Sequence, residues 1–319
     1  MQVVITDYSF PDYSVESSII EPAGHTIVAS KEKKPAAELI PLVTDADAVI
    51  TQFAPVNADV IAAMQKARVI VRYGIGVDNV DLEAARQRRI PVCNVPDYCI
   101  DEVADHTLAF LLGITRQVVA NSNFVHAGKW GLATPLDNLK ALKQMTIGVV
   151  GFGRIGREVV HRLLAFRAKV LVHDPVIAAD QIRAAGAEPV TLRELLSQSD
   201  AITLHCPSTA DTRGMLNSES LAKTKPGVVI VNLARGDLID SAALTAALQS
   251  GHVSAAALDV FSPEPIPADH PVLKMDNVIL ASHIASASVP AVKKLRETAA
   301  KLALMALQGE KLPNVVNGL

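Results

Sequence analysis

The feature that most constrains the fold is a glycine-rich turn between an apolar segment and an amphipathic one. The stretch Ile147 to Val160 reads IGVVGFGRIGREVV, so Gly151, Gly153 and Gly156 form the pattern G-x-G-x-x-G. In this pattern the first glycine permits a tight turn, the second lets the main chain approach a pyrophosphate, and the third lets helix and strand pack closely. A parallel α/β domain that binds a dinucleotide is predicted; the alternative is a strand-to-helix turn without a ligand.

An acidic residue follows at the spacing at which such domains hold a ribose. Asp174 ends the expected strand Lys169 to His173 and lies 18 residues beyond Gly156, where a separation of about 20 is typical. Its carboxylate would bond the ribose and repel a 2′-phosphate, and no Arg follows it directly, which favours NAD as the cofactor. The alternative is a turn-forming aspartate before Pro175.

The glycine turn belongs to the second of two series in which short β-branched segments alternate with helical ones. The first series has expected strands at Val3 to Thr6, Ala48 to Thr51, Val69 to Val71 and Val92 to Val95. The second has six, beginning at Ile147 and continuing at Val170 to Val172, Ala201 to Leu204, Val228 to Val231, Ala255 to Leu258 and Val278 to Leu280. Such alternation predicts two doubly wound parallel sheets covered by helices.

Two segments with helical periodicity flank the second series. Asp101 to about His126 is expected to form one helix that connects two domains. Pro290 to Leu307 has another apolar helical pattern and could return to the first domain. A chain of 319 residues is long enough for two ordinary domains.

Charge and cysteine content narrow the setting of the protein. A net charge of -3 with mixed acidic and basic residues offers no basic face for nucleic acid. Three cysteines cannot all pair within one chain, and no leader-like segment precedes the first expected strand, so a cytoplasmic location is expected. The apolar run Leu108 to Ile114 is far shorter than the roughly 20 residues of a spanning helix, so no membrane segment is expected.

Three residues supply the groups that reduction of a 2-oxo acid requires. Arg235, in NLARG at an expected strand end, could grip a carboxylate and polarise the ketone. His283, in ILASHIA at the end of the last expected strand, could deliver the proton. Glu264, in the loop SPEPIP, could hydrogen-bond the far ring nitrogen and favour imidazolium. Singly, each has a structural interpretation: a surface ion pair, a structural hydrogen bond, or a solvated loop carboxylate.

In combination, the motifs of the chain resemble those of the D-isomer-specific 2-hydroxyacid dehydrogenases over nearly its whole length. They are RYGIGVDNVD (72–81), VCNVP (92–96), VVGFGRIG (149–156), HCP (205–207), NLARG (232–236), ALDVFSPEP (257–265) and SHIASAS (282–288). The resemblance implies a Rossmann NAD domain (99–286) inserted in a flavodoxin-like substrate-binding domain (1–98 and 287–319). It also implies a hinge and an active site in the cleft, with no metal ion.

The same resemblance assigns roles to individual residues. Arg235 would orient the substrate carboxylate, His283 would be the general acid for reduction, and Glu264 would support it. Main-chain N–H groups around Tyr73, Gly74 and Ile75 would reach the same carboxylate. The remaining implied contacts are Arg72 as a possible phosphate contact, Arg154 and Ile155 at the pyrophosphate, His205, Cys206, Pro207 and Ala234 along the cofactor, and Asp259 near the nicotinamide carboxamide.

Three functions remain open within this resemblance. An NAD-dependent reductase of glyoxylate or hydroxypyruvate is favoured, acting as a homodimer through the 101–126 helix. A 3-phosphoglycerate dehydrogenase is the near alternative, although the loop that would carry an Arg for the phosphate reads ITQFAPV, and the chain ends at Leu319 without room for a serine-sensing domain. The third is an NAD-sensing protein similar to the C-terminal-binding corepressors, which have a Trp where Ser286 stands here.

Overall fold

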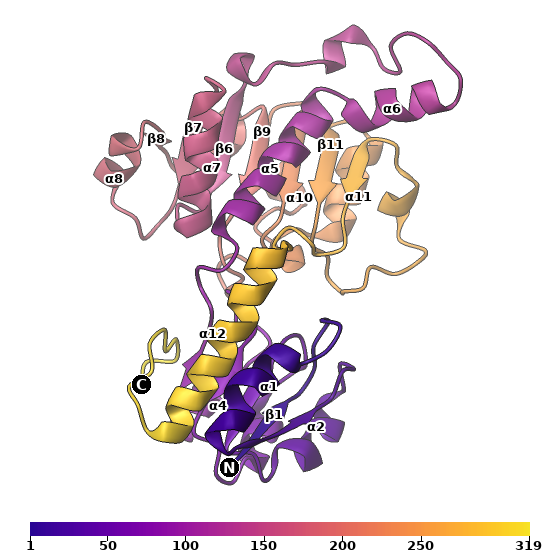
Figure 1. Ribbon diagram of the computed structural model, residues 1–319. Helices are drawn as coiled ribbons and strands as arrows, with labels where there is room; N and C mark the ends of the chain where they lie inside the picture. The colour runs from indigo at the N-terminus through magenta and orange to yellow at the C-terminus, as the bar shows by residue number, and fades with distance from the viewer. The chain divides into compact units, whose positions relative to one another are not determined.

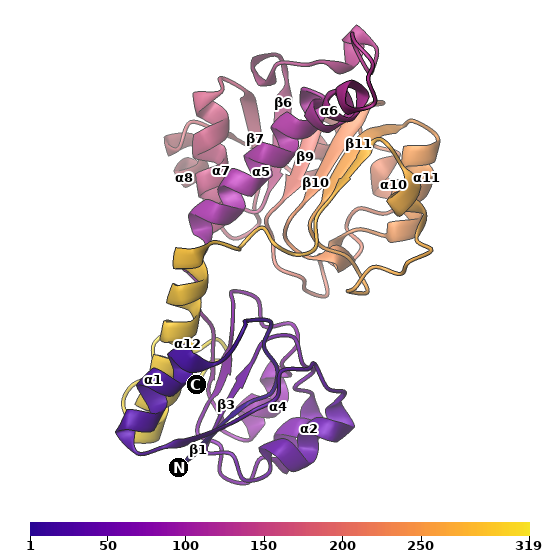
Figure 2. The ribbon, with the colours of Figure 1, turned by 45° about the vertical axis from the view of Figure 1, so that its right-hand side comes forward.

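The chain folds into two compact units in a computed structural model that describes residues 1–319. We call Met1–Tyr98 together with Ser288–Leu319 unit 1, and Cys99–Ala287 unit 2. Each unit has its own parallel sheet, shown with its helices in Figures 1 and 2. No helix in the structure is long and apolar enough to cross a membrane.

Unit 1 contains five parallel strands in the order β2-β1-β3-β4-β5. They are β1 (Gln2–Ile5), β2 (Thr26–Ala29), β3 (Ala48–Thr51), β4 (Ile70–Arg72) and β5 (Val92–Cys93). This 2-1-3-4-5 order is that of flavodoxin-like sheets and confirms the expected fold class. The four expected strands lie where the β-branched segments predicted them, whereas β2 was missed because half of its side chains are exposed and its apolar signal is short.

Helices cover both faces of the unit 1 sheet. They are α1 (Ser14–Ile20), α2 (Ala36–Val43), α3 (Ala58–Ala63), α4 (Leu82–Gln87) and α12 (Val289–Gln308), with a 3-10 turn, η1, at Glu21–Ala23. Ile20 of α1 and Leu295 and Ala299 of α12 pack with Ile5 of β1 and Val71 of β4, so the chain's last helix lies beside its first (Figure 1). The other three helices bury their apolar residues against the opposite face.

Unit 2 contains seven parallel strands in the order β12-β11-β10-β9-β6-β7-β8. They are β6 (Thr146–Val150), β7 (Lys169–His173), β8 (Glu188–Pro189), β9 (Ala201–Leu204), β10 (Val228–Asn232), β11 (Val253–Leu258) and β12 (Val278–Leu280). Six of these were expected. The seventh, β8, escaped prediction because it is a two-residue edge strand that contains a proline, where a ladder N–H is absent.

Helices α5 and α7 pack together in unit 2, while α9, α10 and α11 form a core with the sheet. The helices are α5 (Ile100–Thr115), α6 (Val118–His126), α7 (Arg154–Ala165), α8 (Ala179–Ala184), α9 (Leu192–Gln198), α10 (Ser218–Leu221) and α11 (Ser241–Gln249). Four 3-10 turns complete the unit: η2 (Leu136–Asn138), η3 (Leu142–Gln144), η4 (Gly236–Leu238) and η5 (Pro271–Lys274).

The single helix expected from Asp101 to His126 is wrong, because the structure divides it into α5 and α6. Gln117 adopts a left-handed φ of 54° and its N–H bonds to Ile114, which ends α5 and redirects the chain. Neither glycine nor proline marks this break in the sequence, so the apolar periodicity gave no sign of it.

Candidate active site

The glycine-rich turn joins β6 to α7 and leaves the start of that helix without a side-chain cap. Gly151 has a φ of +97°, and a Cβ there would lie 2.6 Å from the main-chain carbonyl carbon of His205. A Cβ on Gly156 would collide with the carbonyl oxygen of Gly151, so packing requires glycine at both positions. Gly153 differs, since no atom lies within 4 Å of the place its Cβ would occupy. Helix α7 begins at Arg154 and Ile155, and no side chain caps the N–H groups at its start. The open space beside these N–H groups fits a pyrophosphate.

Asp174 lies directly after β7 and holds the glycine turn from the side. Its Oδ2 accepts the N–H of Phe152 at 2.7 Å, and its Oδ1 accepts those of Val176 and Ile177 at 2.8 and 3.0 Å. Burial alone would raise the pKa of Asp174, but these three N–H groups outweigh it and lower the pKa. The residue therefore forms a turn and also presents a negative charge beside the glycine turn.

The HCP segment follows β9, beside the glycine turn. The His205 ring bonds through Nε2 to Thr203 Oγ1 at 2.9 Å, and burial lowers the pKa of His205 to about 3. Its imidazole is therefore neutral at physiological pH and serves packing rather than proton transfer. Burial likewise raises the pKa of the Cys206 thiol to about 11, so it stays protonated next to exposed Pro207.

Arg235 lies in the loop after β10, directly before η4, at the carboxyl end of the sheet. The buried Asn232 shapes this loop, because its amide accepts from the Ala234 N–H at 3.0 Å and donates to the Arg235 carbonyl at 2.8 Å. A Cβ on Gly236 would collide with the main chain of Phe261, which brings this loop against the loop after β11. The structuring role of Asn232 could not be inferred from the sequence, where it is one polar residue ending an apolar strand.

Glu264 and His283 form the hydrogen-bonded pair that the sequence predicted. Glu264 Oε2 lies 2.8 Å from His283 Nδ1, and its Oε1 accepts the N–H of Phe261 at 2.9 Å. Burial raises the pKa of Glu264, but the His283 hydrogen bond and charge, the Phe261 N–H and the charge of Arg235 together lower it below its usual value. An ionised carboxylate thus holds Nδ1 and leaves Nε2 as the ring nitrogen for chemistry.

Asp259 holds the loop that carries His283. Its buried carboxylate accepts the N–H groups of Ile284 and Ala285 at 2.8 and 2.9 Å, and its carbonyl accepts that of His283 at 2.7 Å. These bonds fix His283 in a left-handed conformation with φ 57°, which is uncommon outside glycine. The structure thereby gives Asp259 an anchoring role, and its contact with a nicotinamide carboxamide stays a prediction.

In unit 1 the candidate substrate residues form the loop after β4. The Tyr73 N–H bonds to the Thr51 carbonyl at 2.8 Å, and the Gly74 N–H bonds to the Arg72 carbonyl at 2.9 Å. Two of the expected carboxylate donors are therefore engaged within the chain. The N–H groups of Ile75 and of the following Gly76 are not used in the chain's own hydrogen bonds, and both residues are half-buried.

Neighbouring residues fix the direction of these two N–H groups. The Val95 N–H bonds to the Gly74 carbonyl at 2.9 Å, and Asn94 Nδ2 bonds to the Ile75 carbonyl at 2.7 Å. In a trans peptide the C=O and the next N–H point in opposite directions. Holding the carbonyls of Gly74 and Ile75 therefore aims the N–H groups of Ile75 and Gly76 away from β5. Neither Asn94 nor Gly76 was identified from the sequence.

Arg72 ends β4 and runs beneath the same loop. Its guanidinium is buried, lies 5.7 Å from the centre of the Phe53 ring, and occupies the space that a Cβ on Gly74 would need. Asp7 in turn holds the Phe53 segment, since its carboxylate accepts the N–H groups of Gln52 and Phe53 at 3.0 and 2.7 Å. A contact of Arg72 with a phosphate remains a prediction.

Unit 2 therefore has the sheet order and the glycine turn of a dinucleotide-binding domain, with an acidic residue directly after β7, and a ribose contact of Asp174 stays a prediction. Residues 108–285 match the family described as D-isomer specific 2-hydroxyacid dehydrogenase, NAD binding domain. The chain belongs to this family, with NAD as its cofactor.

Relatives of this chain are named for two different activities. It is 39% identical over 281 residues to D-3-phosphoglycerate dehydrogenase of Mycobacterium leprae, covering 88% of this chain and 53% of that protein. The chain thus spans about half the length of that relative. It is 38% identical over 282 residues to glyoxylate reductase of Korarchaeum cryptofilum, covering 88% of this chain and 85% of that protein.

A solved structure agrees with the fold over both units. D-lactate dehydrogenase of Aquifex aeolicus, complexed with NAD and lactic acid, superposes with a TM-score of 0.87 at 27% identity, covering 97% of this chain and 96% of that one.

We predict that Gly153→Ala weakens NADH binding without unfolding the protein. The added methyl would enter the space in front of α7 and meet the pyrophosphate, at a cost of about tenfold or more in affinity. Fluorescence titration with NADH measures the affinity, and thermal unfolding measures the fold. The matched variant Gly156→Ala should instead lower stability by about 1–3 kcal/mol, because its methyl meets the main chain of Gly151. Unchanged NADH affinity in Gly153→Ala would contradict the assignment.

Proposed function

We propose that this protein reduces a small 2-oxo acid to the D-2-hydroxy acid with NADH, and catalyses the reverse reaction with NAD. The observation that carries the proposal is the Glu264–His283 pair at 2.8 Å, held by main-chain bonds at the carboxyl edge of the unit 2 sheet. Arg235 is close enough for its charge to lower the pKa of Glu264. These are the cation, the acid and the orienting carboxylate that the reaction requires.

Each side chain has one step in this mechanism. NADH, when bound, supplies the hydride. Arg235 grips the substrate carboxylate and polarises the ketone through its guanidinium fork. His283, protonated on Nε2, gives its proton to the oxygen of the reduced carbon, and it takes the proton back in the oxidative direction. Glu264 holds Nδ1–H and stabilises the imidazolium.

We also propose that main-chain donors of unit 1 bind a substrate carboxylate. We assign this role to the N–H groups of Ile75 and Gly76, because Tyr73 and Gly74 use theirs within the chain. Two N–H groups held in fixed directions bind an anion without the entropy that a flexible side chain would lose.

Glyoxylate or hydroxypyruvate is the substrate type that we favour. The segment Thr51 to Ala54, where a phosphate-binding Arg would be expected, has no basic side chain and places Phe53 against Arg72. The 3-phosphoglycerate dehydrogenase alternative rests on the relatives of that name and on the buried guanidinium of Arg72. The corepressor-like alternative, NAD sensing without turnover, gives no reason for an ionised carboxylate to hold the His283 ring.

A panel of 2-oxo acids tests the function. NADH oxidation should proceed with glyoxylate or hydroxypyruvate at a higher kcat/KM than with pyruvate or phosphohydroxypyruvate. A preference for phosphohydroxypyruvate would replace the favoured substrate with the phosphorylated one. Tight NADH binding without oxidation by any member of the panel would support the sensing alternative and refute the enzyme.

We predict that two substitutions separate the acid from its support. His283→Ala should lower turnover by about a hundredfold to ten-thousandfold, the usual worth of general acid catalysis, while NADH binding is retained. Glu264→Gln keeps a hydrogen bond but removes the negative charge that favours imidazolium. Reduction, which needs imidazolium, should then fail at lower pH than in the unmodified protein, whereas oxidation, which needs neutral imidazole, should extend to lower pH. Initial rates in both directions from pH 5 to 9 provide the measurement.

The pH profiles distinguish this mechanism from one with another acid. If His283→Ala turns over its best substrate at nearly the normal rate, His283 is not the acid. If Glu264→Gln shifts both directions toward higher pH, the carboxylate does not act on the imidazolium.

We also propose that the protein is a homodimer, formed through α6 and the segment that follows it. Within residues 101–126, α5 buries much of its apolar surface in unit 2, whereas α6 exposes Val118, Val119 and Val125. Trp130 is 92% exposed, and Leu136 is exposed as well. Val119 also lines a hollow of about 610 Å³ between α6, the 129–140 segment and the starts of β10 and β11. A second copy of the chain, packed on the same surface about a two-fold axis, would cover these apolar side chains. All three cysteines are free, which favours a reducing cytoplasm.

Light scattering at micromolar concentration tests the dimer. The unmodified protein should have the mass of two chains, and Trp130→Asp combined with Leu136→Asp should shift it to one, because two charges would be buried unpaired. Val176→Asp is the matched control: Val176 is also an exposed apolar residue of unit 2, at 86%, but it follows the carboxyl end of β7 and does not line the hollow. A monomeric unmodified protein would refute the proposal.

A further inference from the structure

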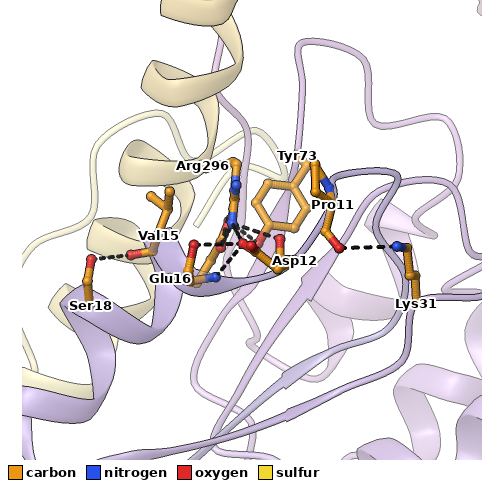
Figure 3. A network of polar contacts seen from close by, with 9 residues as sticks. Pro11, Asp12, Val15, Glu16, Ser18, Lys31, Tyr73 and Arg296 are labelled. Atoms are coloured by element: carbon orange, nitrogen blue, oxygen red, sulfur yellow. Dashed lines mark hydrogen bonds and ion pairs between the residues drawn. The ribbon is translucent and has the colours of Figure 1, made fainter.

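A buried polar cluster in unit 1 has no role in the mechanism above. Figure 3 shows it: Glu16 on α1, Arg296 on α12 and Tyr73 after β4 converge on one point. Glu16 Oε1 accepts from Tyr73 Oη at 2.9 Å and from Arg296 Nε at 2.9 Å, and Glu16 Oε2 accepts from Arg296 Nη2 at 2.7 Å. One carboxylate thus joins three elements that are far apart in the sequence.

Burying these charged side chains costs free energy of desolvation. Glu16 is 0% exposed and Arg296 is 7% exposed, so a full ion pair has been removed from water. Attraction in the interior offsets that desolvation only when geometry is close to ideal, and apolar residues of similar volume are often as stabilising. The two-pronged contact satisfies this condition. Stability alone, however, gives little reason for ions here.

Tyr73 connects the cluster to the candidate carboxylate loop. Its ring packs edge-on against Phe10 with centroids 5.4 Å apart, and burial together with the charge of Glu16 raises its pKa well above the ordinary value. The phenol therefore stays protonated and donates to Glu16. Its main-chain N–H is bonded to the Thr51 carbonyl, so the residue is fixed at both ends.

The chain leaves Tyr73 and reaches the two free N–H groups within three residues. Gly74, which has a φ of +147°, can adopt many conformations, so nothing intrinsic to it holds the direction of the turn. Asn94 and Val95 hold the far side of the loop through the Ile75 and Gly74 carbonyls. At the start of the loop, Tyr73 is held by its N–H bond to the Thr51 carbonyl and by its hydroxyl bond to Glu16.

We propose that Glu16 and Arg296 are positioning residues for substrate binding, acting through the Tyr73 hydroxyl to hold the N–H groups of Ile75 and Gly76 in register. The proposal rests on the function proposed above. It makes helix α12 part of the substrate site's support, since Arg296 fixes the carboxylate that Tyr73 requires.

Two single substitutions and their combination test this. Tyr73→Phe removes only the hydroxyl, and Glu16→Gln replaces the carboxylate by an amide that cannot accept from both partners in the same way. Each should raise KM for the best 2-oxo acid about tenfold or more, because small displacements of positioning groups are costly, with a smaller change in kcat. NADH affinity should not change. The double variant should be little worse than either single one, because both remove the same link.

Asp12→Asn is the matched control. Asp12 contacts the same guanidinium, at 3.4 Å from Arg296 Nη2, but does not contact Tyr73 and is exposed. It should leave KM, kcat and NADH affinity unchanged.

The outcomes separate this inference from the proposed function. If the unmodified protein reduces none of the 2-oxo acids, the proposed function is wrong, and the positioning role that rests on it is wrong as well. If it is active and a folded Tyr73→Phe keeps its KM, the positioning role is wrong. Loss of thermal stability in Glu16→Gln with an unchanged KM would likewise overturn it and leave the cluster a purely structural one. Binding of oxamate, an unreactive 2-oxo acid analogue, should weaken in parallel with the rise in KM.

Discussion

Carboxylates that accept main-chain N–H groups hold the loops on which the rest of the site depends. Asp174 holds the glycine turn through the Phe152 N–H, and Asp259 holds the loop of His283 through two N–H groups. In unit 1, Asp7 does the same for the segment after β3. Loops at strand ends have donors that no ladder satisfies, and an ionised oxygen is the strongest acceptor available to them.

This arrangement also sets the electrostatics of the site. A carboxylate that receives several N–H groups keeps a low pKa although it is partly buried, as Asp174 and Glu264 show. Negative charge therefore persists beside the cofactor turn, where main-chain N–H groups hold it, and beside the imidazole, where His283 and Arg235 add to the effect of the Phe261 N–H. Glu16 is the exception, because its partner is the guanidinium of Arg296 rather than the main chain.

Hydrogen bonds to the loops also set the direction in which their main-chain N–H groups point. A peptide group presents its C=O and the next N–H on opposite sides, so a bond to one aims the other. Asn94 uses this at the Ile75 carbonyl, which leaves the Gly76 N–H pointing away. Glycine at position 74 leaves room for the buried Arg72, whose guanidinium occupies the space that a Cβ would need. The directions of the Ile75 and Gly76 N–H groups thus depend on Asn94 and Val95, which bond to the carbonyls of the same peptide groups.

The sequence by itself determined the parallel α/β class, most strands, the glycine turn and the Glu264–His283 pair. The strands and the glycine turn have local signals in hydrophobic periodicity and in a motif between an apolar and an amphipathic segment, whereas Glu264 and His283 were paired from the chemistry that a 2-oxo acid requires and from the family's motifs. The break at Gln117 and the edge strand β8 were hidden, since neither has a strong local signal.

Only the tertiary structure decided which N–H groups at 73–76 remain available, that Asn94 and Asp7 bond to the loops, and that Glu16 meets Tyr73 and Arg296. Those roles depend on hydrogen bonds between residues distant in the chain, such as Arg296 with Glu16, and a sequence pattern does not show which distant polar groups meet once helices and strands have packed.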